Sequence, residues 1–207
     1  MTTSLLHLAA FQIGTHALGP GCRAGVWVQG CPFHCRGCIA PEWILPGGEA
    51  VQVSDLAERI AADECLEGLT LSGGEPMQQA GALAELVRQV KHNRPELNVI
   101  CFTGYRYEEL LSRPPNAGVA ELLAQVDLLI DGPFIEAQND DLGLRGSANQ
   151  VFHYLTDRLK GQGLESSPRR VEVSLRDGQA FIIGVPPKGF RAAWEQAMLV
   201  VHKERDR

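Results

Sequence analysis

The sequence lacks any long apolar segment. No apolar run approaches the roughly 20 residues that a helix needs to cross a bilayer. Residues 1–11 contain no lysine or arginine before their short apolar stretch, so they do not have the form of a secretory signal peptide. Internal repeats, low-complexity tracts and long linkers are also absent. These absences favour a cytoplasmic protein that forms one domain over residues 1–207, with no membrane partner.

The chain also lacks an excess of positive charge. Lysine and arginine number 19 against 25 aspartates and glutamates, which gives a formal net charge of -6. Because binding to phosphates requires a basic face, this balance argues against nucleic acid as an obligatory partner. Hydrophobic residues make up 44% of the chain, which is enough for a packed core and argues against disorder.

Cysteine is too sparse for a disulfide scaffold. The 207 residues contain only six cysteines, whereas disulfide-rich secreted domains are shorter and denser in cysteine. Cys31, Cys35 and Cys38 lie close together, and the other three are scattered. This pattern suits metal binding in a reducing compartment. Of the scattered cysteines, Cys65 and Cys101 are expected to pack as small core residues.

Predicted strands and helices alternate through the first two thirds of the chain. Apolar, β-prone runs predict strands at 25–29, 69–71, 98–102 and 126–130. Helical spacing of apolar residues predicts helices from Ser54 onward and at 78–93, 107–111 and 119–125. Strands that alternate with helices imply βαβ units, so we expect an α/β fold with a parallel sheet.

The last third has a different pattern. Residues 170–175 alternate, Asp177 and Gly178 form a turn signal, and an apolar run returns at 180–185. A helix is expected from Phe190 onward. We therefore predict an antiparallel hairpin and a terminal helix, over about residues 168–207, added to the parallel core.

A CxxxCxxC motif follows the first predicted strand. Its three thiolates can hold three corners of an iron–sulfur cube, and no fourth cysteine lies in the same loop. One iron would then lack a protein thiolate, and an open coordination position is what chemistry requires. Two alternatives remain. One is a zinc site that uses His34 as fourth ligand, and the other is a closed cluster that uses Cys22.

A glycine–glutamate turn follows the second predicted strand. Gly73 and Gly74 allow the backbone to approach a ligand closely, and Glu75 offers a carboxylate to an ammonium group. The alternative is an ordinary strand-to-helix turn in which Glu75 favours the helix N-terminus. Thr103 and Asp131 follow the third and fourth strands. Because the carboxyl ends of parallel strands meet on one face, all four exits are expected to line one mouth.

These motifs resemble the radical S-adenosylmethionine (SAM) superfamily, and more closely the small activating proteins of anaerobic ribonucleoside-triphosphate reductase. The resemblance spans about residues 22–155. It rests on five segments: 30–38, 70–76, 102–109, 130–134 and 145–150.

The resemblance implies a partial (β/α) barrel. It implies a [4Fe–4S] cluster on Cys31, Cys35 and Cys38, whose fourth iron is chelated by the amine and carboxylate of SAM. It further implies that 73–75 hold the methionine end, and that reductive cleavage of SAM gives a 5′-deoxyadenosyl radical. In that family the radical takes hydrogen from a glycine of a partner glycyl-radical enzyme, and the electron is expected from a reduced flavodoxin- or ferredoxin-type donor.

Three further residues are candidates for binding SAM. Thr103 lies at a strand exit, and Asp131 would orient a ribose hydroxyl or cap the following turn. Arg145 would pair with the SAM carboxylate or ribose region, or else form an ion pair with Asp140 or Asp141.

Two other functions stay open from the sequence. One is a radical SAM enzyme that modifies a small molecule or peptide directly, with the C-terminal hairpin as a substrate cover. The other is a non-catalytic zinc or iron–sulfur binding module.

Overall fold

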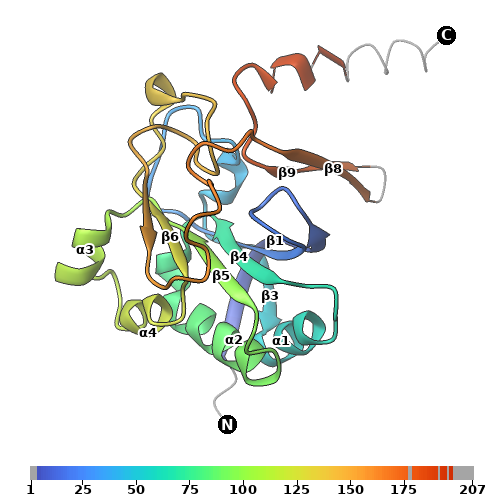
Figure 1. Ribbon diagram of the computed structural model, residues 1–207, viewed down its shortest axis with the longest axis vertical. Coiled ribbons are helices and arrows are strands. Elements are labelled where there is room, and N and C mark those ends of the chain that lie inside the picture. The colour runs from blue at the N-terminus through green and yellow to red at the C-terminus, as the bar shows by residue number, and fades with distance from the viewer. Residues whose placement is uncertain (1–3, 177–178, 191, 195, 198–207) are drawn as a thin grey trace.

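A seven-stranded mixed sheet runs through the described part of the chain. The computed structural model describes residues 4–176, 179–190, 192–194 and 196–197. The strand order is β3-β1-β2-β4-β5-β6-β7 (Figure 1). The strands are β1 (Leu5–Thr15), β2 (Arg23–Val28), β3 (Glu49–Gln52), β4 (Gly68–Gly73), β5 (Asn98–Phe102), β6 (Leu128–Asp131) and β7 (Val151–Tyr154).

The centre of this sheet is parallel. β2, β4, β5 and β6 pair in parallel, which confirms the four strands predicted from the apolar runs. β1 pairs antiparallel with both β2 and β3, and β7 pairs antiparallel with β6, so both edges of the sheet are antiparallel additions. The predicted α/β class is confirmed, and the arrangement is consistent with a partial (β/α) barrel.

Three of the described helices pack on one side of the sheet. These are α1 (Val53–Ala61), α2 (Ala80–Asn93) and α4 (Val119–Leu123), which lie side by side in Figure 1, while α3 (Tyr107–Ser112) follows β5. Short 3-10 turns occur at Pro41–Trp43, Pro76–Gln79 and Glu136–Gln138. The buried stripe of α2 includes Leu83, Leu86, Val87 and Val90, which pack in the main core.

No described helix combines the length and the apolar character that a membrane span requires. The start of α1 also differs slightly from the prediction. The helix begins at Val53 rather than after Ser54, and its first turn has no side-chain cap.

The predicted C-terminal hairpin is confirmed. β8 (Val171–Arg176) and β9 (Gln179–Gly184) pair antiparallel and form a sheet of their own, separate from the main sheet in Figure 1. The predicted turn at 177–178 and most of the predicted terminal helix lie outside the described residues. Of that helix, residues 190, 192–194 and 196–197 are described, and they are helical.

Candidate functional site

The cysteine loop leaves the carboxyl end of β2 and is held by backbone hydrogen bonds. Gly30 N donates to Trp43 O over 2.9 Å, and Cys31 N donates to Ile44 O over 2.9 Å. Within the loop, Cys38 N donates to Cys35 O over 3.1 Å. All three cysteines of the motif are partly exposed, so their thiols are accessible to a ligand.

The glycine–glutamate turn lies directly against this loop. Gly74 N donates to Val28 O over 2.7 Å, and Glu75 N donates to Gly30 O over 2.8 Å. Gly73 adopts φ +111°, and a Cβ at Gly74 would overlap the Gly30 carbonyl. Glycine is therefore required here because the two backbones approach too closely for a side chain. The structure brings together the two motifs that the sequence predicted to share a site.

Glu75 joins this turn to the exit of β5. Its buried carboxylate accepts hydrogen bonds from Met77 N at 2.9 Å, Thr103 Oγ1 at 2.8 Å and Gly104 N at 2.7 Å. Burial raises the pKa of Glu75 to about 7, against the opposing effect of these three donors. A carboxylate has about four acceptor positions, so one remains for a further donor.

A cavity of about 580 Å³ lies where the strand exits meet, within the usual range for small-molecule sites. Its lining on the core side includes Cys31, Cys35, Cys38, Gly73, Gly74, Glu75, Thr103, Gly104 and Gly132. Residues from the exits of all four parallel strands therefore line one mouth, as the sequence predicts. On its other side the cavity is lined by 184–189, which comprise the last residue of β9 and the five residues after it.

Comparison with known proteins assigns this arrangement to a family. The model of the 4Fe-4S single cluster domain matches residues 17–153. The anaerobic ribonucleoside-triphosphate reductase-activating protein of Vibrio cholerae serotype O1 is 38% identical over 147 residues, which cover 67% of this chain and 91% of that protein. The chain belongs to this activating-protein family. Proteins with the same name from Haemophilus influenzae and Escherichia coli K12 are 34% and 32% identical, over 65% and 66% of this chain and 89% and 91% of theirs.

Membership of the activating-protein family implies a [4Fe–4S] cluster and SAM, and the residues present fit both. The cysteine loop supplies only soft thiolate donors to the cavity, which suits an iron–sulfur cluster. Burial raises the pKa of Cys31 to about 11, so a metal that binds there displaces a proton. The match to the 4Fe-4S single cluster domain favours the cluster over the zinc alternative that used His34.

The alternative with Cys22 as a fourth cluster ligand is wrong. Cys22 precedes β2, whereas the cysteine loop follows it. A strand of six residues is about 20 Å long at roughly 3.3 Å per residue, so the two ends of β2 cannot share a cluster. Cys22 N instead donates to Glu67 Oε1 over 3.1 Å. Cys101 is buried as expected, but Cys65 is exposed, contrary to the prediction that it packs in the core.

Asp131 and Arg145 lie beside the cavity and are engaged with protein groups. Asp131 accepts hydrogen bonds from Tyr107 N at 2.6 Å and Val151 N at 3.3 Å, and His153 Nε2 lies 2.9 Å from its Oδ2. Arg145 Nη2 forms an ion pair with Asp140 Oδ2 at 2.7 Å. These contacts are of the structural kind that the sequence left open as alternatives to SAM binding.

Several residues that shape the cavity have no functional role in the sequence-based prediction. Trp27 and Trp43 both line it, and Arg169 lines it from the C-terminal segment. The two tryptophans contact each other and Phe181 of β9. A signal for this cluster exists only in the amphipathic alternation of β9, which does not reveal the partner strand.

Proposed function

We propose that this chain is a radical SAM enzyme that generates a glycyl radical on anaerobic ribonucleotide reductase. The observation that carries the proposal is the convergence of the cysteine loop and the glycine–glutamate turn on one cavity, hydrogen-bonded through Gly30. The family and the names of its curated members support the same function.

In this proposal Cys31, Cys35 and Cys38 hold the [4Fe–4S] cluster and leave one iron without a protein thiolate. Within the described ranges, no other cysteine lines the cavity. The bound cluster supplies the electron that cleaves SAM to methionine and a 5′-deoxyadenosyl radical.

The glycine–glutamate turn and the neighbouring strand exits bind SAM. Gly73 and Gly74 present backbone to the methionine end, and the remaining acceptor position of Glu75 takes a hydrogen bond from its ammonium group. Thr103 keeps the Glu75 carboxylate in place. Asp131 and Arg145 act from outside the cavity wall by fixing the segments that carry Gly132 and Gly146, both of which line the cavity.

The partners of this reaction follow from its chemistry. A glycine of the reductase supplies the hydrogen atom, and a reduced flavodoxin or ferredoxin supplies the electron. The radical must be shielded from water, so the reductase segment closes the mouth that the strand exits leave open.

One observation favours a second candidate, the direct modification of a small molecule or peptide. The segment 184–189 lies outside the family match and yet lines the cavity. Incorporation of deuterium from a labelled small substrate into 5′-deoxyadenosine, without any reductase present, would favour this candidate over the activating function.

The test is anaerobic reconstitution of the wild type and of Cys31→Ala, Cys35→Ala and Cys38→Ala. We expect each variant to lose the cluster and the reductive formation of 5′-deoxyadenosine, measured by iron and sulfide content and by product analysis. Cys65→Ala is the matched control and is expected to keep both, because Cys65 is exposed and does not line the cavity. Full iron content and SAM cleavage in all three loop variants would refute the assignment.

A further inference from the structure

The C-terminal segment of residues 168–189, here called the wall segment, is attached to the site although it lies outside the family match. That match ends at residue 153, and the curated relatives cover only about two thirds of this chain. The described residues of the wall segment nevertheless contact the core at three separate places.

The first attachment is Arg169. Its side chain is only 2% exposed. Its Nη2 donates to Arg145 O at 2.6 Å and to Gly146 O at 3.1 Å, and its Nη1 donates to Pro186 O at 3.0 Å. One guanidinium therefore joins the core loop at 145–146 to the part of the wall segment that lines the cavity.

A pair of aspartates completes this attachment. Arg169 Nη1 lies 3.2 Å from Asp141 Oδ1, and the same oxygen accepts a hydrogen bond from Lys188 N at 2.6 Å. Asp140 Oδ1 lies 3.9 Å from Arg169 Nη2. The buried positive charge is thus paired, which is the condition under which an arginine is retained in a protein interior.

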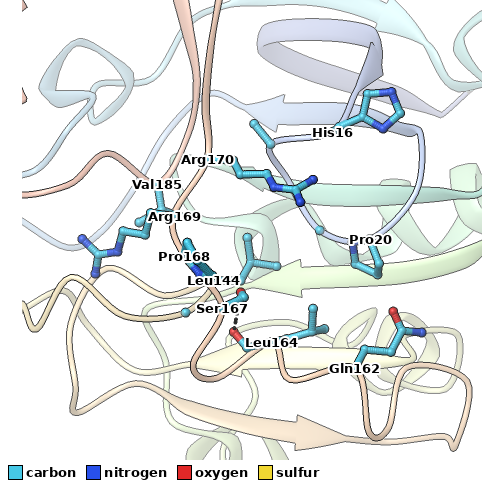
Figure 2. Close-up of a pocket in the computed structure, with 13 residues that line it drawn as sticks. His16, Pro20, Leu144, Gln162, Leu164, Ser167, Pro168, Arg169, Arg170 and Val185 are labelled. Atoms are coloured by element: carbon cyan, nitrogen blue, oxygen red, sulfur yellow. Dashed lines mark hydrogen bonds between the residues drawn. The ribbon is translucent and has the colours of Figure 1, made fainter.

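Arg169 and its neighbour Arg170 point in opposite directions (Figure 2). The Arg170 side chain extends toward the loop that carries His16 and Pro20, which border a separate cavity of about 320 Å³. The guanidinium of Arg169 points away from that loop in the same view. Arg170 is exposed and does not line the larger cavity, so it provides a matched control for Arg169.

The second attachment is aromatic. The Phe181 ring of β9 meets the Trp27 ring of β2 edge to face, with centroids 5.4 Å apart, and lies 6.3 Å from the Trp43 ring. Ile183 of the same strand is 2% exposed and packs in this cluster. Edge-to-face aromatic pairs contribute roughly 0.5–1.5 kcal/mol of stabilisation beyond the effect of their buried area. This contact therefore holds the hairpin in a defined position against β2.

The third attachment is polar and lies on β8. Glu172 accepts hydrogen bonds from Thr15 Oγ1 at 2.7 Å and from His16 N at 2.8 Å. Thr15 is the last residue of β1 and His16 comes directly after it, so both donors are far from Arg169 in the sequence. The three attachments together fix the position of both strands of the hairpin relative to the main sheet.

We propose that the wall segment is a built-in wall of the SAM pocket, and that Arg169 is the positioning residue that holds 184–189 against the cofactor. One side of the cavity is then closed by the chain itself and not by a partner. This role in SAM binding rests on the proposed function, whereas the position of 184–189 on the cavity that the three cysteines also line is a property of the chain alone.

The first experiment measures thiol alkylation by a bulky maleimide in the full-length, cluster-free chain, with the labelled cysteines located by mass spectrometry. We expect Arg169→Met to label Cys31 about tenfold faster than the wild type, because loss of the attachment opens the wall locally. Exposed Cys65 normalises the reagent, and buried Cys101 reports global unfolding. Arg170→Met is the control and is expected to label at the wild-type rate. Arg169→Lys keeps the charge but cannot reach all three carbonyl oxygens, so it is expected to label at a rate between those of the wild type and Arg169→Met.

A second variant covers the case in which Arg169→Met unfolds and Cys101 labels as fast as Cys31. Phe181→Ala removes the aromatic contact and leaves Arg169 intact, with Leu175→Ala as its control because Leu175 is 77% exposed on the same hairpin. Selective acceleration at Cys31 in Phe181→Ala supports the wall. Equal rates in Phe181→Ala and Leu175→Ala would overturn it.

The second experiment measures the Kd of SAM for the reconstituted protein by equilibrium dialysis. We expect Arg169→Met to bind SAM about tenfold more weakly at unchanged iron content, which corresponds to about 1.4 kcal/mol. Unchanged SAM affinity, despite faster labelling of Cys31, would overturn the positioning role. If even the wild type fails to bind SAM, the proposed function fails, while the labelling experiment still decides whether the wall exists.

Discussion

The buried carboxyl of Glu75 gives the chain a testable dependence of stability on pH. Burial raises the pKa of Glu75 from its ordinary value of 4.5 to about 7 in the folded chain. Between these values the folded state binds a proton that the unfolded state does not bind, so the free energy of unfolding falls as the pH rises. Above about pH 7 this contribution is lost in full, and below about pH 4.5 it is present in full.

The size of the effect follows from the difference between the two pKa values. It corresponds to about 3 kcal/mol in the free energy of unfolding across the window from pH 4.5 to pH 7. Glu75→Gln removes the titration but keeps an amide of similar shape. In this variant an amide nitrogen can face Gly104 N, which now donates to the carboxylate, and a buried donor left unpaired costs about 1–3 kcal/mol. That cost does not depend on pH.

The assay is urea unfolding of the cluster-free wild type and of Glu75→Gln at several pH values from 5 to 8. Other titrating groups are shared by both proteins, so they cancel in the difference between the two free energies of unfolding. As the pH rises from 5 to 8, we expect the free energy of unfolding of the wild type to fall relative to that of Glu75→Gln. The expected fall is about 3 kcal/mol, less the part of the titration that lies below pH 5. A difference that stays constant would mean that the three hydrogen-bond donors keep Glu75 ionised and that burial does not control its pKa.

Glu75→Ala is further expected to weaken SAM affinity more than it lowers iron content.

Two further substitutions test how the fold supports the site. Gly74→Ala is expected to lower the free energy of unfolding by about 2 kcal/mol or more and to lower cluster content, because a Cβ there overlaps the Gly30 carbonyl. Wild-type stability and iron content in this variant would contradict the prediction. Arg23→Lys is expected to cost about 1–3 kcal/mol in denaturant unfolding, because the buried guanidinium donates to Thr70 Oγ1 and Leu69 O, and an ammonium cannot reach both. An unchanged midpoint of unfolding in Arg23→Lys would show that these acceptors find other donors.

The parallel centre of the fold was predictable because its signals are local. Each of β2, β4, β5 and β6 is a short, mainly apolar run that ends in glycine or a polar residue or is followed directly by a polar one, and such runs identify buried strands in α/β folds. The antiparallel strands β1, β3 and β7 were not predicted. Their burial is partial and mixed, so their apolar pattern is weak and their pairing depends on neighbours that are distant in sequence.

The candidate site likewise has parts with a local sequence signal and parts without one. The cysteine loop and the glycine–glutamate turn could be found because each is a contiguous motif at a strand exit. Their direct contact through Gly30 was expected only from the general rule on strand ends. Arg169 could not be found, because its function depends on carbonyl groups at 145, 146 and 186, which no spacing in the sequence relates to one another.

Closure of the cavity is therefore the part of the site that only the structure reveals. A cysteine loop that leaves one iron without a thiolate works only where water and stray reactants are kept out, so the chemistry of the motif requires walls that the motif does not contain. In this chain the wall is formed by residues that lie outside the family match but share contacts with Trp27, Gly146 and Thr15 inside or beside that match. An extension that is attached at three places to the elements bordering the cavity acts on access to that cavity. The length of this extension does not distinguish a wall of the cavity from an unrelated appendage. The buried guanidinium of Arg169 makes that distinction, because it joins the extension to the core.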